Sequence, residues 1–370
     1  MSLLTITTVT LALSFMMYLL LIPLAVTSGL VDRPDARKHH NGEIPLVGGL
    51  GVFLTLMLVG GWVFPVNQVT LAIGLSSALM VMVGVMDDRH DLSVRLRILV
   101  QLAAASVLVF VGGIQVETLG NLLGMGEIRL GWLAAPFTIV AIMTAMNAYN
   151  MIDGIDGLLG SLALVTFFGV AALALLHAQA VPLLIALIMM AALVAFLAHN
   201  MGGGRLALRK IFMGDAGSMF IGLLVVCLLA LMTVPGQLAS VGGALGFASV
   251  EGEAVPVRPV AVLWLIAIPL MDMFGIMARR IMKRQSPFKP DRDHLHHIFM
   301  RAGFTALETL GVITTAGILL VLFGLMLEML QVPESIVALL YIGVFSGYLY
   351  CLRRAWQIAS SIRTWRGIDV

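Results

Sequence analysis

Long apolar runs alternate with short polar stretches along the whole chain. Eleven of these runs approach the roughly 20 residues that an α-helix needs to cross a ~30 Å hydrocarbon core. They predict helices near 3–28, 46–66, 68–86, 96–117, 132–149, 157–177, 181–199, 216–235, 259–278, 309–330 and 335–352. The pattern therefore predicts an all-α polytopic integral membrane protein with about 11 transmembrane helices, because backbone groups in lipid must bond internally.

Composition and the lengths of the connections agree with this fold class. Hydrophobic residues make up 60% of the chain, charged residues make up 11%, and the mean hydropathy is +1.03, whereas soluble domains are about half apolar. No connection is long enough for a second soluble domain, so residues 1–370 are expected to form a single transmembrane domain. The first run is too long for a signal peptide and is expected to stay as an anchor.

The basic residues predict the orientation. If the first helix enters from outside, 20 of the 22 Lys and Arg lie in the inner connections, which are 29–45, 87–97, 147–156, 200–215, 279–308 and the tail from Arg353. The positive-inside rule then places the N-terminus on the periplasmic side and the C-terminus in the cytoplasm. The net charge of +2 follows from this topology, so no nucleic-acid partner is expected.

Two adjacent carboxylates, Asp87 and Asp88, end the third predicted helix. Because they repel one another, keeping both suggests a bound cation or a proton-transfer role. One would bind metal while the other accepts a proton from an incoming phosphate. The alternative is a solvated helix end, where Arg89, Arg95 and Arg97 serve only as topology determinants.

A second cluster repeats amides and acids at every third position, at Asn147, Asn150, Asp153 and Asp156. The first three share one flank of the fifth predicted helix. Asp156 is expected after a glycine bend, where it can cap the sixth helix beside a bound pyrophosphate. Ordinary capping would explain Asp156 but not two amides and a further acid in an apolar helix.

The segment FMGDAGS precedes the eighth predicted helix. Asp215 is expected at the N-cap, and Gly214 and Gly217 allow the backbone to approach a phosphate or a metal-bridged phosphate. An ordinary N-cap is the alternative. Deeper in the ninth helix, Asp272 is expected to face the site or to pair with an arginine.

Three histidines lie in the longest inner connection, within SPFKPDRDHLHHIFMRAGF. His294 and His297 are expected to share a helical face, with His296 turned away. The strongly basic surroundings disfavour a transition-metal site and favour binding of a diphosphate. A basic helix lying on anionic lipid is the alternative. His177 and the six acids away from the cytoplasmic side, Glu328 among them, are interpreted as surface features.

The four clusters return acids, amides, glycines and histidines to one membrane face, as a phosphate site at the lipid boundary requires. Carboxylate oxygens there suit Mg²⁺ or Mn²⁺. The segments VDRPDARKHHNGEIPLVGGL, DDRHDLSVRLRILVQ, NAYNMIDGIDGL, RKIFMGDAGS and the histidine segment together resemble the polyprenyl-phosphate N-acetylhexosamine-1-phosphate transferase superfamily of glycosyltransferase 4 type, across residues 31–304. Within it, the chain is most similar to the bacterial undecaprenyl-phosphate GlcNAc-1-phosphate transferases.

This resemblance implies a magnesium-dependent phosphoglycosyltransferase of the bacterial inner membrane, with its active site facing the cytoplasm. UDP-GlcNAc and undecaprenyl phosphate would give undecaprenyl-diphospho-GlcNAc and UMP, the first membrane step of O-antigen or common-antigen synthesis. It also implies a homodimer. Another UDP-HexNAc donor is the alternative, while the HLHH pattern argues against a muramoyl-pentapeptide donor. A membrane transporter is a rival from another class, although transporter sites usually lie near mid-bilayer.

The resemblance also assigns roles to single residues. Asp215 would bind magnesium together with Asp88, and Asp87 or Asp88 would deprotonate the lipid phosphate. Phe212 matches a position that stacks on uracil. The residues implied in catalysis are Asp87, Asp88, Asp153 and Asp156. Those implied in substrate binding are Asn147, Asn150, Asn200, Phe212, Arg97, Arg280, His294, His296 and His297.

Overall fold

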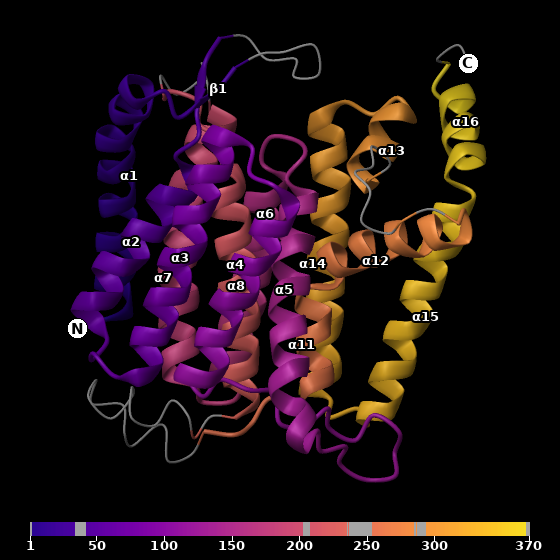
Figure 1. Cartoon of the computed structure of the whole chain (residues 1–370). Coiled ribbons are helices and arrows are strands. Elements are labelled where there is room, and N and C mark those ends of the chain that lie inside the picture. The colour runs from indigo at the N-terminus through magenta and orange to yellow at the C-terminus, as the bar shows by residue number, and fades with distance from the viewer. Residues whose placement is uncertain are drawn as a thin grey trace.

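The computed structural model describes residues 2–33, 42–202, 208–234, 236, 254–284, 286 and 294–367, which form a bundle of helices (Figure 1). The longer helices are α1 Leu3–Ser28, α2 Gly48–Val63, α3 Gln68–His90, α4 Val94–Ser106, α5 Ala134–Ile152, α6 Leu158–Leu176, α7 Ala180–Gly202, α8 Gly214–Thr233, α12 Ala267–Met282, α14 Ala306–Met329 and α15 Glu334–Arg353. The shorter elements are β1 Val31–Asp32, β2 Ile44–Pro45, η1 Val107–Val111, η2 Gly131–Leu133, α11 Pro259–Leu265, α13 Leu295–Arg301 and α16 Ala355–Trp365. The strands β1 and β2 pair antiparallel.

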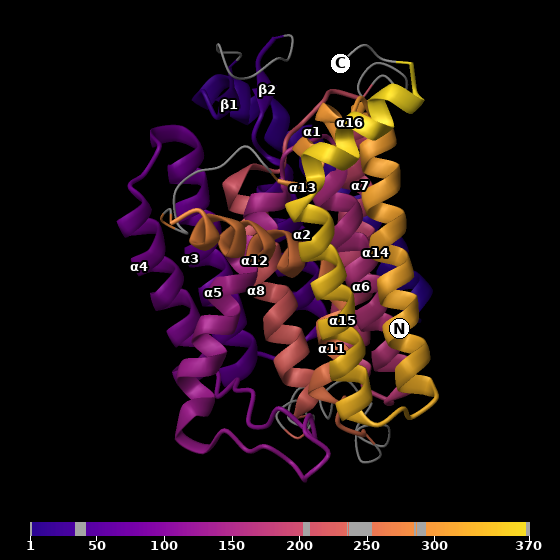
Figure 2. The same ribbon diagram turned by 90° about the vertical axis from the view of Figure 1, so that its right-hand side faces the viewer.

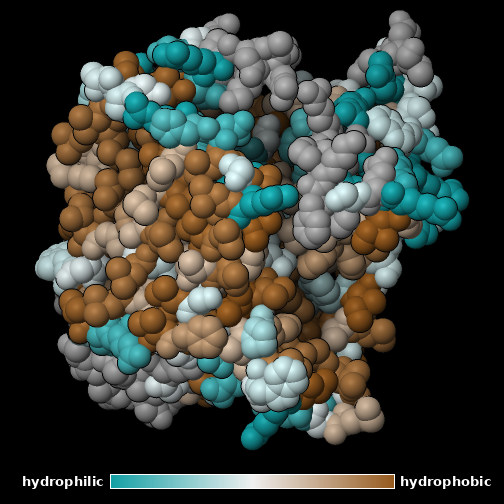
Figure 3. All heavy atoms as spheres, in the orientation of Figure 1, coloured by the Kyte–Doolittle hydropathy of each residue, from teal (hydrophilic) through white to brown (hydrophobic). Residues whose placement is uncertain are grey.

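All eleven predicted segments coincide with helices. Nine spans of the described chain are long and apolar enough to cross a membrane, and α11 with α12 would make a tenth. The predicted segment 46–66 also forms a helix, α2, but this helix is not among the spans because it has only 16 residues. The structure is therefore the all-α polytopic membrane protein that the sequence predicts. Apolar side chains cover the flank of the bundle and hydrophilic ones gather toward its two ends (Figure 3).

The predicted segment 259–278 is not one straight helix, and that expectation is wrong. α11 and α12 meet at 83°, and α12 lies across the bundle in both views (Figures 1 and 2). Pro269 has no N–H to donate to the carbonyl of Leu265 and its ring would clash there. The Leu265 carbonyl instead accepts from Thr166 Oγ1 at 3.0 Å. A hydropathy pattern cannot predict that a threonine hydroxyl replaces a backbone N–H as the donor to the Leu265 carbonyl.

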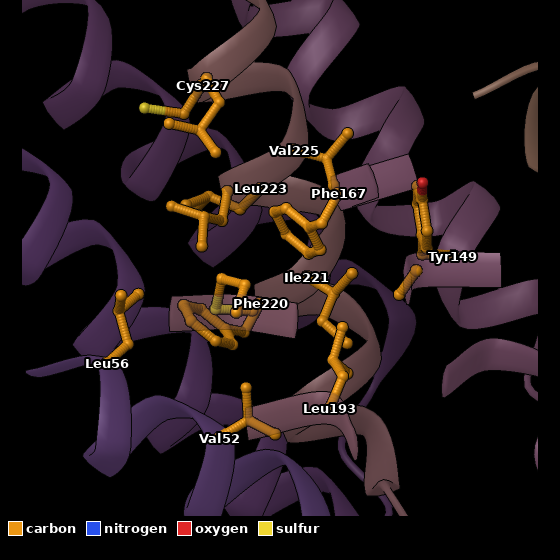
Figure 4. Packing of buried hydrophobic residues seen from close by; sticks show 14 of the residues in the cluster. Val52, Leu56, Tyr149, Phe167, Leu193, Phe220, Ile221, Leu223, Val225 and Cys227 are labelled. Atoms are coloured by element: carbon orange, nitrogen blue, oxygen red, sulfur yellow. The ribbon is translucent and has the colours of Figure 1, made fainter. Parts of the chain in front are cut away.

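Helix α8 lies at the centre of the bundle, and every residue from Ala216 to Thr233 is buried. Figure 4 shows its apolar side chains packed against those of neighbouring helices. Small residues let the backbones approach closely. A Cβ added to Gly49 of α2 would lie 2.1 Å from the Gly217 Cα, and one added to Gly84 of α3 would lie 2.2 Å from the Ala216 Cα. The start of α8 is thereby held between α2 and α3.

The connections expected on the inner side lie toward one end of the bundle. The hairpin β1–β2, the helix α13 and the helix α16 occupy the upper end in Figure 1, whereas α1 begins at the lower end. An odd number of crossings requires this separation of the first and last helices. The assignment of the upper end to the cytoplasm stays a prediction from the basic residues.

At the lower end a buried ionic cluster joins three segments. Glu328 near the end of α14 accepts a hydrogen bond from Arg258 Nε at 2.7 Å, and its other oxygen lies 3.1 Å from His177 Nε2. Arg258 also donates to the Val332 carbonyl at 2.6 Å. Both Glu328 and His177 are buried, so their interpretation as surface features is wrong.

Candidate active site

The N-terminus of α8 is capped by a side chain from α3. Asp88 Oδ1 accepts from the Asp215 backbone N–H at 2.9 Å, and Asp88 Oδ2 accepts from that of Ala216 at 3.5 Å. The N-cap residue Met213 supplies no capping side chain. Asp215, expected at the N-cap, lies inside the first turn, so that expectation is wrong. The sequence separates Asp88 from Asp215 by 127 positions, which hides this cap from local patterns.

Asp87 has different partners from its neighbour. Its carboxylate is buried, accepts from the Leu92 backbone N–H at 2.7 Å and accepts from Arg97 Nη1 at 2.8 Å. The same Arg97 nitrogen lies 3.5 Å from Asp215 Oδ2. The ion pair with Arg97 therefore holds Asp87, whereas the N-terminus of α8 holds Asp88.

Amides of α5 reach the same place. Asn150 Nδ2 donates to Asp215 Oδ1 at 2.7 Å and lies 2.9 Å from Ser218 Oγ. Asn147 Nδ2 donates to Gln101 Oε1 at 2.9 Å. Gln101 is buried in α4 and was missed by the sequence reasoning. A glutamine inside an apolar membrane helix was the available signal.

Asp153 and Asp156 follow the end of α5. Within the described chain, the Asp153 side chain makes no hydrogen bond or ion pair, and the residue is exposed. Desolvation by the surrounding protein and the negative charges of Asp215 and Asp156 raise the pKa of Asp153 to about 7. Asp153 is thus a carboxylate that is available to a ligand.

Asp156 does not cap α6, so that expectation is wrong. It forms an ion pair with Lys210 Nζ at 2.5 Å, and this ammonium lies 5.2 Å from the centre of the Phe212 ring. The N-cap of α6 is Gly157, whose N–H donates to Asn200 Oδ1 at 2.6 Å. Lys210, a second residue that the sequence reasoning missed, connects the acids after α5 to the segment before α8.

Asn200 and Phe212 belong to a firmly held segment. Asn200 Nδ2 donates to the Ile211 carbonyl at 2.8 Å, so both ends of this buried amide bind backbone. The Phe212 N–H donates to the Pro45 carbonyl, and the Phe212 carbonyl accepts from the Gly48 N–H at 2.8 Å. These bonds make Asn200 a positioning residue for the chain that leads to Asp215.

The histidine segment reaches the site through α13. His294 is the N-cap of α13, and its Nδ1 lies 3.1 Å from Asp272 Oδ2, so Asp272 pairs with a histidine. Asp272 also accepts from the Leu295 N–H at 2.9 Å and from Tyr348 at 3.1 Å. This buried carboxylate therefore fixes the start of α13.

His296 is not turned away from the site, contrary to expectation. It is buried, and a Cβ added to Gly154 would lie 2.0 Å from its Nε2, so the ring lies against the turn between Asp153 and Asp156. Burial, and then the neighbouring His297 and His294, lower the pKa of His296 to about 3, which keeps the ring neutral. The ring of His297 lies 4.2 Å from that of His296. Arg280 is buried at the end of α12.

The structure thus brings the four clusters together. Comparison with known proteins matches the part of the chain that holds three of them. A family model described as glycosyl transferase family 4 matches residues 70–234, from α3 to α8. A protein of Yersinia pestis named undecaprenyl-phosphate alpha-N-acetylglucosaminyl 1-phosphate transferase is 39% identical over 348 residues, covering 92% of this chain and 89% of its own. Proteins of the same name from Escherichia coli (strain K12) and Pasteurella multocida (strain Pm70) are 38% and 35% identical, covering 90% and 95% of this chain and 87% and 94% of their own. The chain belongs to glycosyl transferase family 4.

The donor atoms of this family 4 site fit a hard divalent cation. The described residues contain no preformed group of three metal-binding side chains. Mg²⁺ commonly takes only one or two carboxylates and completes its shell with water and substrate phosphate. Desolvation and then the negative charge of nearby Asp215 raise the pKa of Asp153, as expected where carboxylates crowd without a cation between them. Asp215, at the start of α8 where Asp88, Arg97 and Asn150 meet, would be the residue to hold such an ion.

Proposed function

We propose that this chain transfers GlcNAc-1-phosphate from UDP-GlcNAc to undecaprenyl phosphate, giving undecaprenyl-diphospho-GlcNAc and UMP. The names of its relatives support the two substrates. The observation that carries the proposal is the meeting of Asp88, Arg97 and Asn150, from three helices, around Asp215 at the start of α8. A helix N-terminus, acids and a guanidinium are the groups that bind and neutralise a transferring phosphate.

The roles divide between positioning and contact with substrate. Asp88 and Asp87 have both carboxylate oxygens engaged by protein donors, so we assign them to holding α8 and Arg97. Asp153 is free to accept the proton of the acceptor phosphate, since its pKa of about 7 lies near the second pKa of a phosphate, about 6. Bound Mg²⁺ or Mn²⁺ would supply charge neutralisation for the diphosphate. His296, which lies against Gly154, and Phe212, which lies beside Lys210, are assigned to the donor.

In the direct route, an oxygen of the deprotonated acceptor phosphate bonds to the β-phosphorus of UDP-GlcNAc while the bond to the α-phosphate oxygen breaks and UMP leaves. In a covalent route, a carboxylate oxygen bonds to the β-phosphorus as UMP leaves. The acceptor phosphate then bonds to the same phosphorus, and the carboxylate is released. Release of UMP by enzyme without acceptor would support the covalent route. Strict dependence of UMP release on undecaprenyl phosphate would support direct attack.

We place the enzyme in the bacterial inner membrane with this site on the cytoplasmic side, where the basic connections lie. The family resemblance further suggests a homodimer. Cysteine labelling from outside intact cells tests the orientation, and mass measurement of the protein in lipid nanodiscs tests the dimer. Labelling of a cysteine placed at the exposed Arg301 position by an impermeant reagent would refute the orientation.

Transfer of radiolabel from UDP-[¹⁴C]GlcNAc into butanol-extractable lipid tests the activity. We expect Asp215→Asn to lose about 10²-fold or more, as is usual when an electrostatic group is removed from a transfer site. The matched control is Glu127→Gln, an exposed carboxylate paired with Arg129 at the other end of the bundle. No labelled lipid from wild-type protein would reject the reaction, and equal loss in both variants would reject the site. Competition by other UDP-HexNAc nucleotides tests the donor.

A further inference from the structure

A cavity of about 170 Å³ lies between the second half of α2, the beginnings of α3 and α7, and the middle of α8. On α3 it is lined by Val69, Thr70, Leu71, Ile73 and Gly74, whereas Asp87 and Asp88 lie at the other end of the same helix. The 13 residues from Gly74 to Asp87 correspond to roughly 20 Å of helix. The cavity is therefore separate from the candidate active site.

The shortness of α2 creates this cavity. Its 16 residues span about 24 Å, less than the ~30 Å hydrocarbon core, while α3 and α7 beside it have 23 residues each. Glycines widen the gap that remains. Among the described residues, a Cβ added to Gly61 would meet nothing within 4 Å, and one added to Gly74 would meet only Met57 Sδ at 3.9 Å.

The chemistry of the walls excludes a polar ligand. Buried Leu56 and Leu224 lie among the lining residues. Thr70 carries the one polar side chain among the described residues of the lining, and its hydroxyl already donates to the Pro65 carbonyl at 2.9 Å. An apolar cavity of about 150 Å³ stays dry and accepts hydrocarbon. Val66 and Leu71 at the edge are exposed, so the cavity opens on the lipid-facing side.

We propose that this cavity binds the end of a fatty acyl chain of a phospholipid. The cavity lies beside α3, α7 and α8, which are long and apolar enough to cross a membrane, where lipid chains are the available apolar molecules. A phospholipid whose headgroup lies at the outer end of the bundle brings its chain directly past Val66 and Leu71. The acceptor lipid of the transfer reaction has its phosphate at the opposite end, so it is the less suitable occupant. The chain fills volume that the short α2 leaves open.

Photo-cross-linking in lipid nanodiscs tests this site. The probe is phosphatidylethanolamine with a diazirine near the end of one acyl chain, and we expect adducts concentrated in residues 56–74 of the wild-type protein. Gly74→Leu places a side chain in the cavity. It should lower these adducts about tenfold, because two groups cannot occupy one closely packed volume. Gly61→Leu is the second variant if Gly74→Leu does not give folded protein.

The matched control is Gly343→Leu in α15, where an added Cβ also meets nothing within 4 Å. It should leave the adducts in residues 56–74 unchanged, and all three variants should retain transfer activity. Adducts spread evenly over the lipid-facing helices, or unchanged in the filled variants, would overturn the site. Loss of the adducts on adding undecaprenyl phosphate would show a prenyl chain there and overturn the assignment to phospholipid.

Discussion

The approach of Asp88 to the first turn of α8 depends on Gly214. This glycine has φ of 72°, and a Cβ added there would lie 2.5 Å from Asp88 Oδ2. We expect Gly214→Ala to lower the free energy of unfolding by about 1–2 kcal/mol from backbone strain and to reduce transfer about 10²-fold by displacing the Asp88 carboxylate. Thermal unfolding and lipid labelling measure the two effects. Gly343→Ala is the control, and near-normal activity in Gly214→Ala would contradict this account.

The free carboxylate of Asp153 predicts an acid limb in the pH profile. Its pKa of about 7 means that the ionised form is lost as the pH falls through 7, so kcat/KM should fall about tenfold per pH unit below that point. A bound cation favours the ionised form. Saturating Mg²⁺ should therefore move this limb to lower pH than limiting Mg²⁺ does. If the acid limb did not shift with the Mg²⁺ concentration, or if it persisted in the residual activity of Asp153→Asn, the limb would belong to another group.

At this scale, sequence reasoning located the polar clusters but not their partners. Asp88, Asn150 and Asp215 stand out because acids and amides are costly in apolar helices. Their contacts join positions 65 and 127 apart, and no local spacing encodes such pairs. Gln101 and Lys210 were missed since each is a single polar residue without a motif.

At the level of secondary-structure elements, one hydroxyl group stabilises the break between α11 and α12. Thr166 Oγ1 bonds both the Leu265 carbonyl at 3.0 Å and Tyr149 Oη at 2.7 Å. Thr166→Val should cost about 1–3 kcal/mol, because a buried carbonyl loses its partner. Activity should fall as well, since α12 carries Asp272 and so sets the start of α13. Thr55→Val is the matched control, because Thr55 is also buried but its hydroxyl has no hydrogen-bond partner among the described residues. Equal unfolding temperatures for the two variants would contradict this explanation.

The positions of the helices were predictable from the sequence because an apolar run has about the length of the membrane-spanning helix that it forms. Predicted and observed ends of α1 agree, at residues 3 and 28. Hydropathy fails where a helix changes direction without changing composition, as at Ile266 between α11 and α12. Pro269, three residues later, was the only local sign of that break.

In the whole molecule, one end of the bundle carries the candidate site and the other end carries an ion-pair cluster that stabilises the fold. The upper end in Figure 1 carries the acids, amides and histidines of the candidate site, while the buried cluster of Glu328, Arg258 and His177 ties helices together at the lower end. The buried helix α8 connects the two ends and holds the site at its N-terminus. Stability and catalysis should therefore respond separately to changes at the lower end.

Glu328→Gln tests this separation. The change leaves Arg258 without its carboxylate, and breaking a buried ion pair typically costs about 3–5 kcal/mol. We expect a clearly lower unfolding temperature but normal transfer at temperatures where the variant is still folded. Replacing both partners, in Arg258→Met with Glu328→Met, should recover much of the stability because no buried charge is left unpaired. Glu127→Gln breaks an exposed pair with Arg129 and should not change the unfolding temperature measurably. If Glu328→Gln lost transfer activity while fully folded, the lower cluster would be coupled to the site through α8 and α14, and the two ends would not be independent.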